Sequence, residues 1–188
     1  MTCAMSHDHY SSLSLEPGDI RLLRVLPDKD EAAPIRCQLF NYSLHESTKG
    51  THLYEALSYV WGNPKKVLPI FVADHPFDVT ENLHAALLRL RDRSFERVIW
   101  VDAICINQED NSEKEHQILS MAKIYSQANR VIVWLGEAED NSDEALKALR
   151  AAGMNGNVLR NQAIQQAILQ LLQRPWFRRV WVRQQTFE

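Results

Sequence analysis

The sequence contains no long apolar run and no framework of paired cysteines. No stretch approaches the roughly 20 apolar residues of a membrane helix, and the N-terminus lacks the apolar segment of a signal peptide, so the sequence predicts neither a membrane protein nor a secreted one. The three cysteines, Cys3, Cys37 and Cys105, are far apart and form no CxxC pair. This pattern favours a reducing, cytoplasmic location.

An excess of positive charge is also missing. The 21 lysines and arginines stand against 24 acidic residues, which gives a net charge of −3 at pH 7 and argues against a nucleic-acid binder that works through bulk electrostatics. No glycine-rich phosphate loop is present, which argues against a P-loop nucleotidase. No His, Cys and Asp spacing is typical of a metal site. The sequence therefore predicts no bound metal and no prosthetic group.

What is present is the composition of an ordinary soluble globular protein. The chain has 188 residues, of which 45% are hydrophobic and 24% charged, enough to form one domain with a sizeable core. Residues 1–15 are polar and rich in His, Ser and Met, which predicts a flexible N-terminal arm. We expect residues 16–188 to form a single domain.

Apolar runs and amphipathic patterns alternate along the chain. They predict strands at residues 20–26, 35–42, 54–61, 98–106 and 130–135, and a hairpin at 67–72 and 77–79. A helix capped by Thr80 has an apolar stripe at Leu83, Ala86, Leu87 and Leu90. A second helix starts with a capping box, Ser112 and Glu115, and has Ile118, Met121, Ala122 and Tyr125 on one side. Further helices are predicted at 142–152, 161–173 and 174–185.

This order predicts an α/β fold, with a mostly parallel central sheet flanked by helices. The two leading strands and the hairpin should add antiparallel edges. Ligands of such sheets bind beyond the carboxyl ends of the strands. The three central strands are expected to end at residues 61–62, 102–108 and 135–137, so a site should assemble from these loops and a helix that reaches them.

Several stretches match, in order and spacing, the motifs of a known family. They are YEALSYVWG at 54–62, WVDAICINQ at 100–108, Glu113-Lys114 with Gln117, Met121, Ile124 and Tyr125, VWLG at 133–136, and residues 174–184. With these motifs the chain resembles the fungal heterokaryon-incompatibility (HET) domain family. The resemblance implies a role in the cell-death response that follows fusion of incompatible fungal cells.

The family in turn looks distantly like Toll/interleukin-1 receptor (TIR) domains, which implies a flavodoxin-like sheet. Catalytic TIR domains hydrolyse NAD with a Glu that lies four residues after a Trp. Trp181 and Gln185 have this spacing here, but Gln replaces the family's Glu. The replacement keeps the shape of the side chain and removes its charge, so this chain should be impaired as an enzyme. An engineered change and a naturally inactive member both explain it; alternatively, Gln185 is a helix-surface residue without consequence.

The candidate catalytic residues are therefore Gln185 and, as a second choice, Glu113, which matches the family but also suits the start of a helix. Asp102 either contacts a ligand or orders the following loop. Several of the remaining candidates for nucleotide binding also have a structural alternative: a core ring for Trp61, loop bracing for the two amides, and a solvated helix face for the Arg. These candidates are Trp61, Gly62, Asn107, Gln108, Trp181 and Arg179.

The leading hypothesis is a TIR-like HET domain that binds NAD or a related nucleotide and, in active relatives, hydrolyses it to trigger cell death. We expect NAD to be a substrate rather than a cofactor. Expected partners are further copies of the chain and an upstream sensor domain or protein. The alternative is a non-enzymatic module that signals by self-association. Cys105 is expected to be structural rather than a nucleophile.

Overall fold

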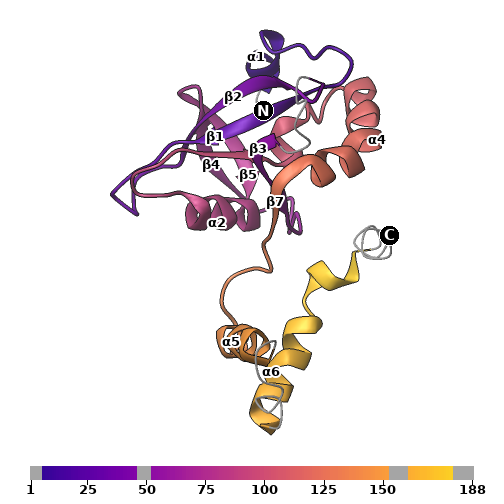
Figure 1. The fold of residues 1–188 in the computed structure, drawn as a ribbon. Coiled ribbons are helices and arrows are strands. Elements are labelled where there is room, and N and C mark those ends of the chain that lie inside the picture. Colours follow the sequence, from indigo (N-terminus) through magenta and orange to yellow (C-terminus); the bar gives the residue numbers. More distant parts are fainter. Residues whose placement is uncertain (1–5, 46–51, 153–160, 180–188) are drawn as a thin grey trace. The chain divides into compact units, whose positions relative to one another are not determined.

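In the computed structural model of the chain, residues 6–45, 52–152 and 161–179 are described. Contacts between Cα atoms divide the chain into two compact units, residues 1–134 and 135–188. Figure 1 follows the elements along the chain. The first unit contains α1 (Ser6–Ser11), β1 (Asp19–Val25), β2 (Arg36–Ser43), β3 (His52–Ser58), β4 (Val67–Val72), β5 (His75–Thr80), α2 (Glu81–Leu90), β6 (Arg97–Trp100), α3 (Asp102–Cys105), α4 (Asn111–Gln127) and β7 (Ala128–Val133). The second contains α5 (Ser142–Ala152), α6 (Gln162–Leu172) and the 3₁₀ helix η2 (Pro175–Arg178).

The described strands form one mixed sheet in the order β5-β4-β2-β1-β6-β3-β7. β3 pairs in parallel with both β6 and β7, and β2 pairs in parallel with β4. The pairs β1–β2, β1–β6 and β4–β5 are antiparallel. The α/β class is thus confirmed, but only the β6-β3-β7 part has the expected continuous parallel pairing.

β1 lies inside the sheet, between β2 and β6, and is not the edge strand that the sequence predicted. Its side chains explain this position, because five of its seven residues are buried, as an interior strand covered on both faces requires. β1 therefore joins the N-terminal antiparallel strands to the parallel strands.

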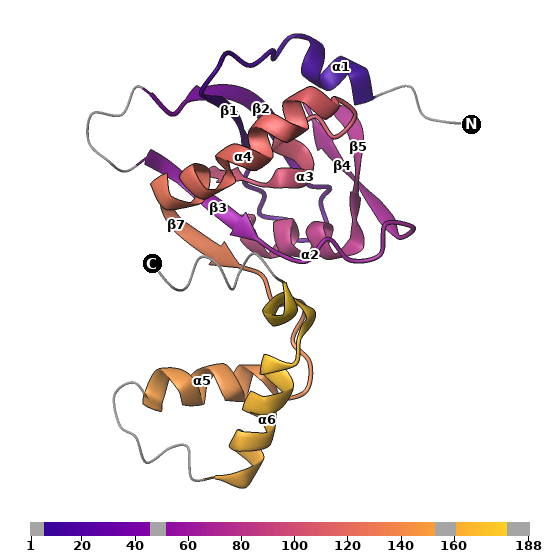
Figure 2. The same cartoon turned by 90° about the vertical axis from the view of Figure 1, so that its right-hand side faces the viewer.

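α2 and α4 cover opposite faces of the parallel strands (Figure 2). This arrangement follows from right-handed crossovers, since the connection from β3 to β6 and the connection from β6 to β7 run in opposite directions along the sheet. Thr80 caps α2 as expected, with its Oγ1 accepting from the Leu83 N–H at 3.4 Å. Tyr54 on β3 donates its hydroxyl to the carbonyl of Ile124 on α4 at 2.5 Å.

The buried face of α4 is rotated from the one that the sequence predicted. Gln117, Ile124 and Tyr125 are buried, whereas Ile118 is 51% exposed. The reason is that α4 uses two long polar-tipped side chains to contact the sheet. The Gln117 amide donates to the carbonyl of Asp19, and the Tyr125 hydroxyl to that of Leu57.

The strand predicted over residues 98–106 is wrong beyond Trp100. β6 ends there, and residues 102–105 form α3, a single helical turn with Ile104 and Cys105 fully buried. A short apolar run does not distinguish a buried strand from a buried helical turn by its periodicity. The turn begins at Asp102, two residues after the end of the strand.

Residues 6–15 include α1 and a buried tyrosine. α1 places Tyr10 in the core with 7% of its surface exposed, and its hydroxyl donates to the carbonyl of Ile104 at 2.9 Å. One aromatic residue in a polar stretch is enough to anchor the segment, because burial of a tyrosine ring removes a large apolar area from water.

The second unit is a small helical structure. Ala145 on α5 packs with Ala167 and Leu171 on α6, and both helices have the predicted bounds to within a residue. Arg174 donates to the carbonyls of residues 135, 137 and 139 at 3.0–3.1 Å. Of the helix predicted at 174–185, the described part is the short η2. Among all described residues, no helix is long and apolar enough to cross a membrane.

A buried carboxylate ties the three parallel strands together. Glu55 on β3, with 11% of its side chain exposed, pairs through Oε2 with Nε of Arg97 on β6 at 3.2 Å and through Oε1 with Nε of Arg130 on β7. The two arginines approach it from the two strands that flank β3. Glu55 therefore joins both neighbours of the central parallel strand.

We expect Glu55→Gln to lower the free energy of unfolding by about 1.5–3 kcal/mol, because hydrogen bonds to charged groups contribute about that much. The matched control is Glu144→Gln, which removes an exposed pair with Lys147 on α5 and should leave the urea midpoint unchanged. Equal midpoints for the two variants would show that Glu55 does not join the strands.

Candidate functional site

Trp61 and Asp102 meet beyond the carboxyl ends of β3 and β6. The Trp61 indole Nε1 donates to Asp102 Oδ2 at 2.9 Å, and Oδ1 of Asp102 accepts from the backbone N–H of Ala103 at 2.8 Å. Trp61 is 41% exposed, so its ring is not part of the hydrophobic core. Two residues that the sequence predicted as ligand contacts are thus brought together from different strands.

The two amide residues of the motif have different roles. Gln108 reaches back and donates its Nε2 to the carbonyl of Asp102 at 2.8 Å. Asn107 accepts from the N–H of Glu109 through its side-chain oxygen at 3.1 Å. Both contacts brace the turn, which is the structural alternative that the sequence left open.

Gly62 has a positive φ of +80°, a conformation that a residue with a Cβ adopts at a cost. A Cβ there would also lie 3.2 Å from the Cβ of Asn82. The chain therefore needs glycine at the point where it leaves β3 and turns past the first helical turn of α2.

Asn82 is a residue that the sequence reasoning missed. Its Nδ2 donates to the carbonyl of Val60, and its Oδ1 accepts from the indole of Trp134 at 2.9 Å. Asn82 thus links the chain after β3 to the chain after β7. A polar side chain two residues after the helix cap was the available signal, but nothing in the sequence showed what it would contact.

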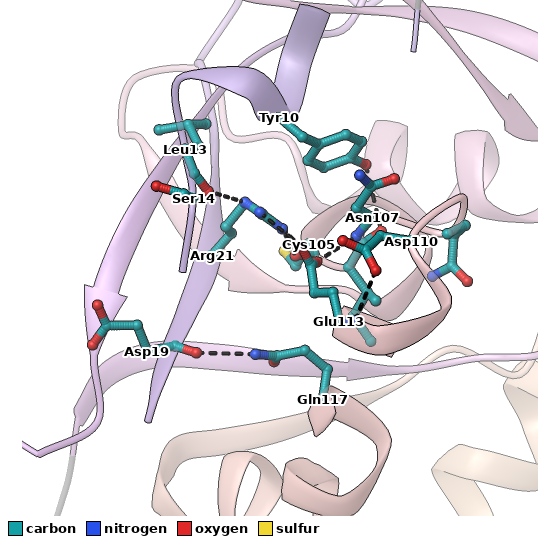
Figure 3. Close-up of polar contacts among 12 residues, drawn as sticks. Tyr10, Leu13, Ser14, Asp19, Arg21, Cys105, Asn107, Asp110, Glu113 and Gln117 are labelled. Atoms are coloured by element: carbon teal, nitrogen blue, oxygen red, sulfur yellow. Dashed lines mark hydrogen bonds and ion pairs between the residues drawn. The ribbon is translucent and has the colours of Figure 1, made fainter. Parts of the chain in front are cut away.

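Glu113 is the second predicted carboxylate, and it forms a bidentate ion pair with Arg21 (Figure 3). The oxygen–nitrogen distances are 2.6 and 2.9 Å, with 2% of the Arg21 side chain and 14% of that of Glu113 exposed. Glu113 Oε1 also accepts from the backbone N–H of Asn107 at 2.7 Å. Sequence reasoning missed Arg21, because a charged residue in a buried strand has no local signature of its partner.

The cap of α4 differs from the predicted one. Asp110 accepts from the N–H groups of Ser112 and Glu113 at 2.9 and 3.1 Å, so the predicted capping box of Ser112 and Glu115 is wrong. Both patterns place a short polar side chain before a helix, and the aspartate two residues earlier is the one whose geometry fits.

A cavity of about 740 Å³ lies between residues 10–21 and one face of α4. Its size is in the range of small-molecule sites. Its charge, however, does not suit a pyrophosphate, because Arg21 is already paired and carboxylates outnumber cations. The charged lining residues are Glu16, Asp19, Asp110 and Glu113 against Arg21 and Lys123.

The remaining predicted residues belong to the second unit or lie outside the described residues. Arg179 follows η2, and its backbone N–H donates to the carbonyl of Trp176 at 3.3 Å. Trp181 and Gln185 lie outside the described residues. Within the described ranges, no three His, Cys, Asp or Glu side chains gather where they would hold a metal ion.

The chain thus contains an α/β domain in which motif residues come together beyond the carboxyl ends of two parallel strands, β3 and β6. A comparison with protein families matches residues 54–185 to the family described as heterokaryon incompatibility protein (HET). The chain therefore belongs to the HET family, as its motifs predicted.

Heterokaryon incompatibility protein 6, OR allele, of Neurospora crassa is similar to the chain, with 35% identity over 159 residues. The match covers 77% of this chain and only 23% of that protein's length. No solved structure matches the chain.

Asp102→Ala should lower the free energy of unfolding by about 1–2 kcal/mol, because it leaves the Trp61 indole N–H and the Ala103 N–H without their acceptor. The ¹H–¹⁵N signal of the Trp61 indole should shift as well. Asp78→Ala, on the exposed side of β5, is the control and should change neither quantity. An unmoved indole signal in Asp102→Ala would contradict the contact.

Cys37 and Cys105 should resist alkylation in the folded protein. Burial raises the pKa of each thiol to about 12, because the thiolate would lose its hydration. At pH 8 only roughly one thiol in 10⁴ is then ionised. We expect mass spectrometry to find both cysteines unlabelled by iodoacetamide at pH 8 in the folded protein and labelled in urea. Rapid labelling of Cys105 in the folded protein would contradict its structural role.

Proposed function

We propose that this domain binds NAD or a related nucleotide beyond the carboxyl ends of β3, β6 and β7, as a TIR-like cell-death effector of the HET family. In active form such a domain hydrolyses the nicotinamide–ribose bond. The observation that carries the proposal is the Trp61–Asp102 contact, which places an exposed ring and a carboxylate at this edge.

The order of the parallel strands supports a TIR-like arrangement. β3, β6 and β7 are the first, second and third strands of the continuous parallel part along the chain, and in the sheet they lie in the order second, first, third. The flavodoxin-like sheet begins with this order, and its ligand lies where the connections diverge, between the first and third strands. Asn82 links the chain segments that leave β3 and β7 at that point.

The residues at this edge suit a nucleotide. The Trp61 ring offers a surface on which a nicotinamide or adenine can stack, and Gly62 permits close approach of the backbone. The cavity beside α4, in contrast, has an excess of carboxylates and does not suit a pyrophosphate.

Hydrolysis requires stabilisation of an oxocarbenium-like ribose while nicotinamide leaves and water adds to the same carbon. In the family pattern a Glu supplies the negative charge; Gln185 can donate or accept a hydrogen bond but carries no charge. Loss of such an electrostatic contribution typically lowers the rate by about 10²–10³ or more. We therefore propose that the chain binds the nucleotide better than it cleaves it.

Gln185→Glu should raise nicotinamide release from NAD by about 10² or more over the present chain. Gln184→Glu introduces the same charge one position away and is the matched control; it should not raise the rate. Nicotinamide is measured chromatographically at rising protein concentration. Failure of Gln185→Glu to release nicotinamide, even at the highest concentration, would remove the enzymatic part of the proposal.

A second function, signalling by self-association without catalysis, is favoured by apolar residues on the outer face of α4. Leu119 is 78% exposed and Ile118 51%, and exposed neighbouring apolar side chains often mark a protein contact. Light scattering at rising concentration tests it: assembly that is independent of NAD and lost in Leu119→Ser would favour this function.

A further inference from the structure

The carbonyl groups at the end of α3 need hydrogen-bond donors from elsewhere. A helix of one turn leaves its last carbonyls without partners in the helix, and Ile104 and Cys105 are fully buried, so water does not supply the donors. The Tyr10 hydroxyl donates to the Ile104 carbonyl at 2.9 Å, and Arg21 Nη1 donates to the Cys105 carbonyl at 3.3 Å. Both donors precede residue 54, where the match to the family begins.

Arg21 holds the same turn by a second route. Its guanidinium binds both oxygens of Glu113, and Glu113 in turn accepts from the N–H of Asn107. The turn from residue 102 to 108 is therefore anchored at Cys105 directly and at Asn107 through Glu113. Figure 3 shows these contacts converging on one guanidinium.

The guanidinium itself is fixed in place. Its Nε donates to the carbonyl of Leu13 at 2.8 Å, and its Cζ lies 4.9 Å from the centre of the Tyr10 ring. Only a planar group with several donors satisfies this set of partners; a lysine offers one nitrogen and cannot form the bidentate pair.

We infer that Arg21 is a positioning residue: through Cys105 and Glu113 it sets the location of the turn that carries Asp102, Asn107 and Gln108. Trp61 is affected too, since its indole is bonded to Asp102. Glu113, with both oxygens engaged, acts here as part of this anchor rather than on a ligand. The consequence for nucleotide binding rests on the proposed function above.

The test separates positioning from stability by comparing three variants. Arg21→Lys keeps the positive charge but cannot form the bidentate pair with Glu113. The double variant Arg21→Met with Glu113→Leu replaces the ion pair by apolar side chains, a change that often preserves stability, but it removes the anchors of Cys105 and Asn107. Arg24→Met, on the same strand and paired with Glu96 at the surface, is the control.

The first measurement needs no ligand: the ¹H–¹⁵N signals of the Asn107 amide and the Trp61 indole, together with the thermal midpoint. We expect both signals to shift in the double variant even if its midpoint equals that of the parent, to shift also in Arg21→Lys, and to stay in place in Arg24→Met. Unchanged signals in a folded double variant would overturn the inference, as would full retention of both signals in Arg21→Lys.

The second measurement is the dissociation constant for NAD. A displaced turn should weaken binding about tenfold or more, because misplacement of a binding group by about 1 Å has effects of this order or larger. Weaker binding by the double variant and by Arg21→Lys, with normal binding by Arg24→Met, is the expected result. If the parent chain does not bind NAD, the proposed function fails, while the signal shifts still decide whether Arg21 positions the turn.

Discussion

The buried pair of Arg21 and Glu113 is the interaction on which the organisation of this domain depends. It joins β1, an interior strand, to the first turn of α4. The same two side chains also bind backbone groups of the turn that follows β6. A buried ion pair is costly to desolvate, and this one offsets that cost by hydrogen bonds to two backbone groups of the turn and to Leu13. The pair thus fixes geometry where the family motif lies.

This anchoring explains why β1 occupies the middle of the sheet. β1 pairs with β6 and brings Arg21 next to the end of that strand. The segment before β1 then returns over the same region and places Tyr10 beside the guanidinium. Elements outside the segment that matches the HET family therefore complete the surroundings of its DAICINQ motif, and the motif cannot be understood as a local structure.

Strands and helices were predictable where apolar residues repeated with one clear spacing, that of a strand or that of a helix. The strands β1, β2, β4 and β5 and the helices α2, α5 and α6 lie within a few residues of their expected positions, because alternation and helical stripes were clear there. The apolar run at 98–106 was misread, since its length fits a strand or a strand with a helical turn. The proximity of Trp61 and Asp102 was predictable in outline, because carboxyl ends of parallel strands meet at one edge. The Arg21–Glu113 pair was not, because 92 residues separate its members.

The sequence by itself determined the family, the α/β class and the identity of the polar residues that follow the central strands. These are properties of local patterns and ordered motifs, which survive without coordinates. Only the tertiary structure decided that Glu113 is bound to Arg21, that Asn82 links β3 to β7, and that the N-terminal segment packs on α3. Such pairings depend on which buried donors find which buried acceptors, and that choice is made by the fold as a whole rather than by neighbours along the chain.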